Sequence, residues 1–342
     1  MSQYCRPELY IGGEQIYNVS DVKFTEKGGS AINSLTVTLT DPEIDEYKWY
    51  NQKVEFFLNY GAQDGVPLFR GYVRQINPSD NKFSFTAMDP RTFLTGKESL
   101  PLQLDDYNNY DGFTLTQFIH HHVSNNININ ETIIGLDMLN ETDPPTLLKG
   151  KRDSGDAYKF ITGNLPTNST SVKKPYKYSI KMIEGNEHSN IAINRDRDIE
   201  NAPSTEFSYE NGISSIKYKR RASPNLYNIK AKTKSISYQK GNISQGPIGG
   251  SIKGDFSDTD EGRKAAILDS ILKEDEIQEI TMTITKGHYL GTGNTIRLNV
   301  EDTQIRRVHR IKSRTVSWNL TKGVTTNLVL NKDLPMVSDY IQ

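Results

Sequence analysis

The sequence predicts a mainly β protein with an α+β insert, in which two antiparallel β-barrels flank a small mixed α/β domain. Three observations lead to this fold class. Apolar and polar residues alternate with period two along many short runs, as in half-buried strands. Turns rich in Gly, Pro, Asn and Asp separate these runs. A central stretch with helical spacing interrupts them. The 342 residues leave room for two or three domains, which we place at 1–99, 100–203 and 204–342.

The first domain, 1–99, is predicted from four short runs. Apolar residues and threonines alternate over 35–40 until Asp41-Pro42, where proline has no amide hydrogen to give a β-ladder. Several short strands at this spacing are typical of an antiparallel barrel or sandwich. The other three runs are 54–58, 68–76 and 83–87.

The second domain, 100–203, mixes helix and strand signals. Leu115, Phe118, Ile119 and His122 fall at helical spacing, and Thr114 or Asp111 is the predicted N-cap of that helix. A second helix is predicted around 157–161. Strands are predicted at 176–180 and 191–193, and we expect these two strands to pair.

The third domain, 204–342, returns to strands and ends in a hairpin. Val316, Trp318 and Leu320 are expected to pair with the run 326–330 across Thr321-Lys322-Gly323, where glycine permits the positive φ of a tight turn. A helix is predicted at about 259–273, because its acidic first turn suits the positive end of the helix dipole. A loop is predicted over 241–254. The remaining strands are predicted at 213–218, 227–231, 280–284 and 296–300.

The first and third domains show the same order of events. In both, an alternating run is followed by a break, a second alternating run and a final hairpin-like pair. The run 35–39 corresponds to 280–284, and 54–58 corresponds to 296–300. Residue identity between them is low, so either an internal duplication or generic β patterning accounts for the pattern.

Composition excludes several classes of protein. The 41 basic and 42 acidic residues give a net charge of −1, which argues against nucleic-acid binding through whole-molecule charge. A single cysteine, Cys5, excludes an internal disulfide framework. No apolar run approaches the ~18 residues needed to span a bilayer, and the N-terminus lacks a signal peptide. We therefore expect a soluble protein that is made inside the cell.

None of the sequence motifs that could indicate a metal, phosphate-binding or catalytic site has the spacing or sequence context that such a site needs. Adjacent helical residues point about 100° apart, so His120, His121 and His122 cannot converge on one metal ion. The glycines of 287–293 lie between two strands, whereas a phosphate-binding loop opens a helix. The sequence has no Gly-x-Ser-x-Gly motif, and carboxylate pairs such as Asp196/Asp198 are common in turns. We predict no catalytic residues, no cofactor, no metal and no enzymatic activity.

Charges are balanced overall but segregated along the chain. Eight basic and two acidic residues lie in 206–240, and nine acidic and three basic residues lie in 255–279. Contacts that set the register between subunits explain opposite blocks of this kind better, and solvated strand faces stay open as the alternative. The candidate subunit-interface charges are Arg306, Arg307, Arg310, Lys312 and Arg314.

Three stretches carry a resemblance to a known family. The first runs from the strand at 34–39 to Leu68-Phe69-Arg70-Gly71-Tyr72-Val73, which resembles a "Phe-x-Gly-x-Val" strand. The second is 287–300, a turn followed by a strand, and the third is the closing hairpin, 305–330. Together they resemble the baseplate hub proteins of contractile phage tails. That group is similar to the late-control D family and to the hub part of type VI secretion spikes.

The resemblance implies a structural virion protein of the tail or baseplate, made in the host cytoplasm. Such hubs are homotrimers with two tube-like barrels per chain, so the trimer presents six barrels to a hexameric tail tube above and receives a trimeric spike below. Other baseplate proteins are further expected partners, and DNA passes through the enclosed channel. Because an arginine-lined pore would hold DNA, we expect Arg306, Arg307 and Arg310 to face neighbours or the outside.

Two other functions stay open from the sequence. A glycan-binding or depolymerising tail-associated β protein is suggested by the 18 tyrosines and by the many polar loop residues. Most of the tyrosines that lie in strand patterns, such as Tyr178 and Tyr218, are of the kind found in cores or interfaces. A distal-tail adaptor of a non-contractile phage differs mainly in its partners.

Overall fold

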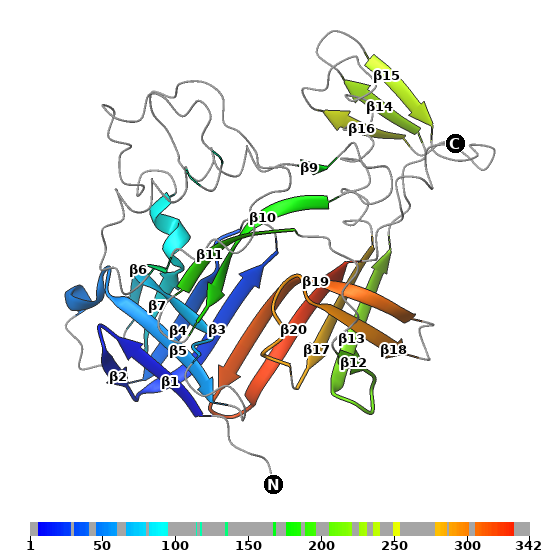
Figure 1. Cartoon of the computed structure of the whole chain (residues 1–342). Helices are drawn as coiled ribbons and strands as arrows, with labels where there is room; N and C mark the ends of the chain where they lie inside the picture. The colour runs from blue at the N-terminus through cyan, green and yellow to red at the C-terminus, as the bar shows by residue number, and fades with distance from the viewer. Residues whose placement is uncertain are drawn as a thin grey trace, which may run out of the picture.

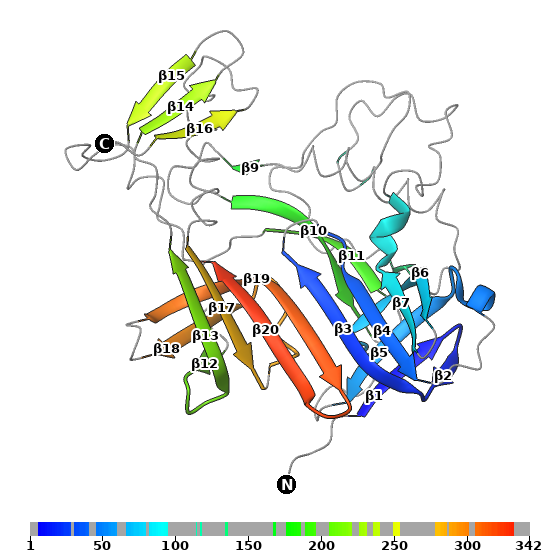
Figure 2. The ribbon, with the colours of Figure 1, turned by 180° about the vertical axis from the view of Figure 1, so that it is seen from behind.

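A computed structural model shows that the residues described below lie mostly in β-strands (Figures 1 and 2). The main sheet has 13 strands, and two smaller sheets have four and three. The mainly β fold class is confirmed. The structure describes residues 6–28, 31–40, 46–59, 66–79, 82–94, 114, 117, 134–135, 167–168, 176–185, 189–195, 205–220, 226–230, 235–239, 249–253, 278–285, 287–300 and 305–331.

The first half of the main sheet is formed by the N-terminal strands. They surround a core in which Phe24, Phe56 and Phe85 are almost completely buried. The predicted alternation is confirmed, since every second residue of 35–39 and 83–87 points into this core. The elements are β1 (Arg6–Ile11), β2 (Glu14–Ile16), β3 (Val19–Lys27), β4 (Ser34–Thr40), η1 (Glu46–Trp49), β5 (Lys53–Asn59), β6 (Phe69–Ser79), β7 (Lys82–Met88) and η2 (Pro90–Leu94).

The second half of the main sheet comes from the C-terminal part of the chain. Its separate core includes Met282, Leu298 and Leu328, all fully buried. Leu320, predicted to pair within the closing hairpin, lies in its turn instead and is 68% exposed. The strands are β12 (Thr205–Phe207), β13 (Ile213–Arg220), β17 (Gln278–Ile284), β18 (Thr295–Val300), β19 (Ile305–Asn319) and β20 (Gly323–Asn331).

The two halves have the same strand order. The first half runs β3-β4-β7-β6-β5-β1, and the second runs β13-β17-β20-β19-β18-β12. The register agrees too: Val37 pairs with Phe85 as Met282 pairs with Leu328. One difference is that β1 lies antiparallel to β5, whereas β12 lies parallel to β18. The correspondence suspected from sequence is therefore present in the hydrogen-bonded pairing.

Local irregularities repeat as well. A bulge leaves Ser20 between the pairs of β3 and β4, and its hydroxyl donates to Thr38 O at 3.0 Å. The second half has the same bulge at Ser214, whose hydroxyl donates to Thr283 O at 3.0 Å.

A second pair of matching features lies before β5 and β18. Asn51 has φ 59° and Gly293 has φ 87°, and their amides donate to Val73 O and Ile311 O at 3.0 and 2.9 Å. Features this specific argue for duplication rather than for generic strand patterning.

One long strand joins the two halves. On one edge of β19, residues 305–310 pair with β18 of their own half, whereas 313–319 pair with β3 of the other half. The main sheet therefore continues from one half into the other (Figure 2). Closure of each half into a barrel of its own stays a prediction.

The smaller sheets come from segments between the halves. The first, in order β8-β11-β10-β9, contains β8 (Ile134–Gly135), β9 (Thr167–Asn168), β10 (Tyr176–Glu184) and β11 (Ser189–Arg195). The β10–β11 pairing confirms the predicted strand partners. The second, in order β15-β14-β16, contains β14 (Leu226–Lys230), β15 (Ser235–Gln239) and β16 (Gly249–Lys253).

Several predictions between the halves have other outcomes. The predicted loop over 241–254 is wrong in part, because it contains β16, which pairs with β14 in parallel. Thr114 and Gln117 exchange the two hydrogen bonds of a capping box, which confirms Thr114 as an N-cap. The predicted helices at 157–161 and 259–273 lie outside the described residues, and the α/β character of the insert stays a prediction.

Candidate functional site

Eight strands of the main sheet present a polar face opposite the two cores. These strands, β13 to β6 in the sheet order, alternate buried residues with exposed or half-buried polar ones, as expected when one face of an antiparallel sheet is solvated. Neighbouring side chains hydrogen-bond across it, as in the 2.6 Å bond from Thr283 Oγ1 to Asn327 Oδ1. Its hydroxyl and amide members include Thr25, Thr36, Thr38, Asn77, Ser79, Ser84, Thr86, Thr281, Thr283, Thr315, Ser317, Thr325 and Asn327.

Arg314 holds the two halves together from within the β3–β19 ladder. It stands opposite Glu26 and its Nε donates to Glu26 Oε2. Its Nη1 donates to the carbonyl of Leu290 at 3.0 Å and to that of His288. Its guanidinium carbon lies 5.2 Å from the centre of the Phe24 ring, in cation–π range. One side chain therefore joins β3, β19 and the turn before β18.

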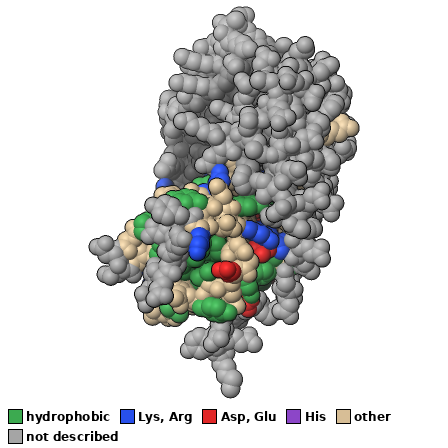
Figure 3. All heavy atoms as spheres, turned by 90° about the vertical axis from the view of Figure 1, so that its left-hand side faces the viewer, with side chains coloured by type: hydrophobic (Ala, Val, Ile, Leu, Met, Phe, Trp, Pro, Cys, Tyr) green, Lys and Arg blue, Asp and Glu red, His purple; other side chains and the backbone are tan. Residues whose placement is uncertain are grey.

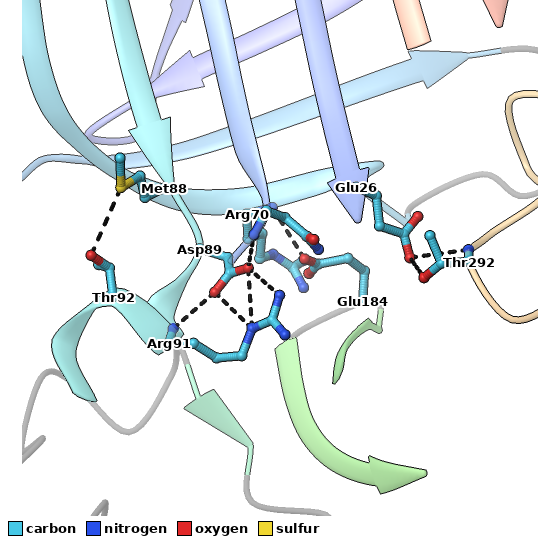
Figure 4. A network of polar contacts seen from close by, with 9 residues as sticks. Glu26, Arg70, Met88, Asp89, Arg91, Thr92, Glu184 and Thr292 are labelled. Atoms are coloured by element: carbon cyan, nitrogen blue, oxygen red, sulfur yellow. Dashed lines mark hydrogen bonds and ion pairs between the residues drawn. The ribbon is translucent and has the colours of Figure 1, made fainter. Parts of the chain in front are cut away.

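Glu26 is bound from a second direction by Thr292 (Figure 4). The Thr292 hydroxyl donates to Glu26 Oε1 at 2.7 Å, and its amide donates to the same oxygen at 3.2 Å. Burial alone would raise the pKa of Glu26, but the Arg314 charge and the Thr292 hydrogen bonds outweigh it and lower the pKa. The pKa of His288 is lowered by burial and by the Arg314 charge. This seam therefore contains an ionised carboxylate.

The β10–β11 hairpin contacts the first half at Arg70. Arg70 Nη1 donates to Gly185 O at 2.7 Å, and the Arg70 backbone amide donates to Glu184 Oε1 at 3.3 Å. The Arg70 Nε is directed elsewhere, to Glu55 Oε1 at 2.8 Å. The hydroxyl of the buried Ser189 donates to Glu184 Oε2.

The pKa values of the two carboxylates near Arg70 are shifted in opposite directions. Burial and, to a lesser extent, the nearby Asp89 raise the pKa of Glu184 to about 7, against the effects of Ser189 and Arg70. Burial would also raise the pKa of Glu55, but hydrogen bonds from Lys53 and Arg70 lower it. Figure 4 shows Glu184 close to Arg70, with Asp89 engaged by Arg91. Protonation of Glu184 thus falls near neutral pH.

The five predicted interface charges all lie on β19. Arg306 and Arg307 lie where β19 pairs with β18. Arg310 is half-buried, and Lys312 occupies the β19 bulge. Arg314 is buried within the chain on Glu26. A subunit-interface role for these residues stays a prediction.

Other candidate motifs have simpler outcomes. The 287–293 segment is a turn, and Gly287 and Gly293 have the positive φ that it requires. The residues His120–His122, Cys5, Asp196 and Asp198 lie outside the described residues. Within the described ranges, no cluster of three metal-ligating side chains is present, and no helix has the length and apolarity to cross a membrane.

Sequence reasoning missed Glu26, Thr292 and Glu184. Glu26 and Arg314 are 288 residues apart, so local spacing cannot connect them. The signal that was available is the interruption of the apolar alternation at Glu26 in β3 and at Arg314 in β19, because a charged residue on a core-facing position needs a partner.

The surface of the first half differs from the polar sheet face. Figure 3 shows hydrophobic side chains there, with acidic and basic ones scattered between them. The most exposed large hydrophobic residue described is Tyr17, at 79%.

Comparison with known proteins identifies the fold. No family model and no curated protein matches the sequence. A tail protein from Neisseria meningitidis is similar with a TM-score of 0.65 and 14% identity, over 98% of this chain and 99% of that one. The 43 kDa tail protein of prophage MuSo2 from Shewanella oneidensis has a TM-score of 0.69 and 12% identity, over 96% and 99%.

A third similar structure comes from a secretion system. The E. coli c3393 protein, a type VI secretion component described as similar to the T4 tail proteins gp27 and gp5, has a TM-score of 0.52 and 12% identity, over 96% of this chain and 80% of that one. The resemblance drawn from the sequence is confirmed at the level of the fold. This chain has the fold shared by these phage tail proteins and by the type VI secretion component.

Proposed function

We propose that this chain is a structural, non-enzymatic hub of a phage tail or baseplate. In this proposal three copies form a ring that joins the hexameric tail tube to the trimeric central spike and encloses the DNA channel. Other baseplate proteins bind its outer surfaces, and the protein resides in the virion after synthesis in the host cytoplasm. The observation that carries the proposal is the same strand order in two halves of one chain that has a tail-protein fold.

The repeat suits a change of symmetry. Three chains with two equivalent halves each present six similar units, which matches a six-fold partner on one side. The segments that are not repeated, such as the β8–β11 sheet, retain three-fold symmetry for a spike on the other side. Head-to-tail contacts between units close into a ring when their rotation allows it.

The polar sheet face supports a passage for DNA. Hydroxyl and amide groups predominate on it, and the lysines there, such as Lys23, Lys82 and Lys217, are accompanied by acidic residues such as Asp21 and Glu279. A surface with few phosphate contacts binds DNA weakly, since affinity grows with the number of phosphates neutralised. DNA would then move past this face without being retained.

The test is the mass of the full chain in solution, followed by imaging. We expect a species of three 38.7 kDa chains, seen end-on as a ring with six similar inner units and three-fold outer features. A chain that stays monomeric up to high micromolar concentration, or a ring without inner six-fold repetition, would contradict the hub proposal.

A further inference from the structure

The internal seam between the halves is a template for a contact between copies. In this seam the outer edge of β3 pairs with 313–319 of β19. By the repeat, β13 is the counterpart of β3, and 75–79 of β6 is the counterpart of 313–317 of β19. The pairing of β3 with β19 therefore shows how a strand edge like that of β13 can pair with one like that of 75–79.

Neither counterpart edge is paired with another of the described strands. β13 is the end of its sheet path and pairs only with β17 among the described strands. β5 pairs with 69–72 of β6 and stops there, so no described strand pairs with 75–79 on the side away from β7. The described part of the chain thus leaves one edge of each of the two types that meet in the internal seam without a strand partner.

Side chains that are buried in the internal seam have exposed counterparts at the two equivalent edges. Phe24 of β3 is 2% exposed beneath β19, whereas its counterpart Tyr218 of β13 is 48% exposed. In the turn that precedes β18, Thr292 is 8% exposed against Glu26, whereas its counterpart Tyr50 is 47% exposed. These aromatic residues are exposed where the internal seam has contacts.

We propose that β13 of one copy pairs antiparallel with 75–79 of β6 in a second copy, and that three such contacts close the ring. This inference rests on the proposed function. The register of the internal seam, in which Thr25 pairs with Thr315 and Lys23 with Ser317, places Lys219 opposite Asn77 and Lys217 opposite Ser79. Repetition of this contact adds the eight-stranded polar face of each copy to one continuous channel wall.

The contact between copies is weaker than the internal seam. The repeat places Arg220 and Ile76 at the positions of Glu26 and Arg314, so the buried ion pair has no counterpart. Pro78 has no amide hydrogen to donate. Proline and lysines on an open edge are also residues that prevent pairing with unrelated strands. Ring closure by three simultaneous contacts offsets the weakness of each one.

Disulfide cross-linking tests the register. In the full chain with Cys5→Ser, the pair Asn77→Cys and Lys219→Cys brings two thiols within bonding reach only across neighbouring copies, because directly opposed strand residues have the Cα separation that a disulfide needs. Mild oxidation is expected to give a covalent trimer as the main species on a denaturing gel, lost on reduction. The matched control is Asn77→Cys with Ser215→Cys, four residues out of register, which is expected to give no covalent trimer.

The outcomes separate this inference from the hub proposal. A trimer by mass that cross-links at 77/219 and not at 77/215 supports both. A trimer that fails to cross-link at 77/219, with circular dichroism like that of the parent, overturns the edge pairing and leaves the hub proposal standing. A chain that is monomeric by mass overturns both.

Discussion

Two seams of this molecule bring an arginine to a glutamate, with opposite results for the carboxylate. In the β3–β19 seam the Arg314 Nε donates directly to Glu26, and the pKa of Glu26 is lowered. Where the β10–β11 hairpin meets β6, Arg70 reaches Glu184 with its backbone amide while its Nε binds Glu55, and the pKa of Glu184 rises to about 7. At Glu26 the Arg314 charge and the Thr292 hydrogen bonds outweigh the effect of burial, whereas at Glu184 burial outweighs the effects of Ser189 and Arg70.

The largest expected effect comes from removing the arginine of the first seam. Arg314→Met leaves Glu26 half-buried without its charge partner and removes donors from two carbonyls. We expect a loss of about 3–5 kcal/mol of unfolding free energy, as for other broken buried ion pairs. Urea unfolding followed by tryptophan fluorescence measures it, because both Trp49 and Trp318 pack in the first core. The control is Lys322→Met in the exposed hairpin turn; a loss below about 1 kcal/mol in Arg314→Met would contradict this account of the seam.

Neutralising the carboxylate is expected to have a smaller effect with a defined pH dependence. Glu26→Gln should lose about 2 kcal/mol at pH 7, the scale of a hydrogen bond to a charged group. Because the pKa of Glu26 is lower in the folded protein than the value of 4.5 expected for the unfolded chain, the ionised carboxylate stabilises the fold at pH values above 4.5. This stabilisation is lost as the pH falls through the pKa of the folded protein. The gap between variant and parent should therefore narrow in acid, and a gap that widens in acid would refute the assignment.

Glu184→Gln is expected to act in the opposite sense. Because its folded pKa of about 7 lies above the ordinary 4.5, the contribution of Glu184 to stability is complete below pH 4.5 and is lost as the pH rises towards 7. Glutamine avoids that loss, so the variant should be more stable than the parent at pH 8 by about 1–3 kcal/mol, with no gain at pH 4. Urea titrations from pH 4 to pH 8 measure the difference. A variant less stable than the parent at pH 8 would show that Glu184 is held as a carboxylate.

The smallest effects test the equivalence of the halves. Ser20→Ala and Ser214→Ala each remove one hydroxyl donated across a bulge, and each should cost about 0.5–1 kcal/mol. Calorimetry of the two variants measures both halves, with Ser215→Ala as the control on the exposed face of β13. Unequal costs would show that the two bulges differ in energy despite their common geometry.

The sequence predicted the strands of both halves because period-two alternation is strong where one sheet face is buried. It also predicted the corresponding runs, since 35–39 and 280–284 occupy the same sheet position. The joining of the halves was not predictable, because β3 carries charges at Asp21, Lys23 and Glu26 that weaken its pattern. Arg314 was counted among surface charges because nothing local indicates a partner so distant in the chain.

The long stretch of chain between β3 and its partner β19 has a consequence for biosynthesis. Val316, Trp318 and Val324 belong to the first core, so the strands made first cannot complete their packing until β19 and β20 have been translated. Until then β3 has an unpaired edge, on which Lys23 and Lys27 disfavour pairing with other strands. Premature termination near residue 300 would leave this edge of β3 without its partner strand. Chains shortened in this way are therefore expected to self-associate instead of entering assembly.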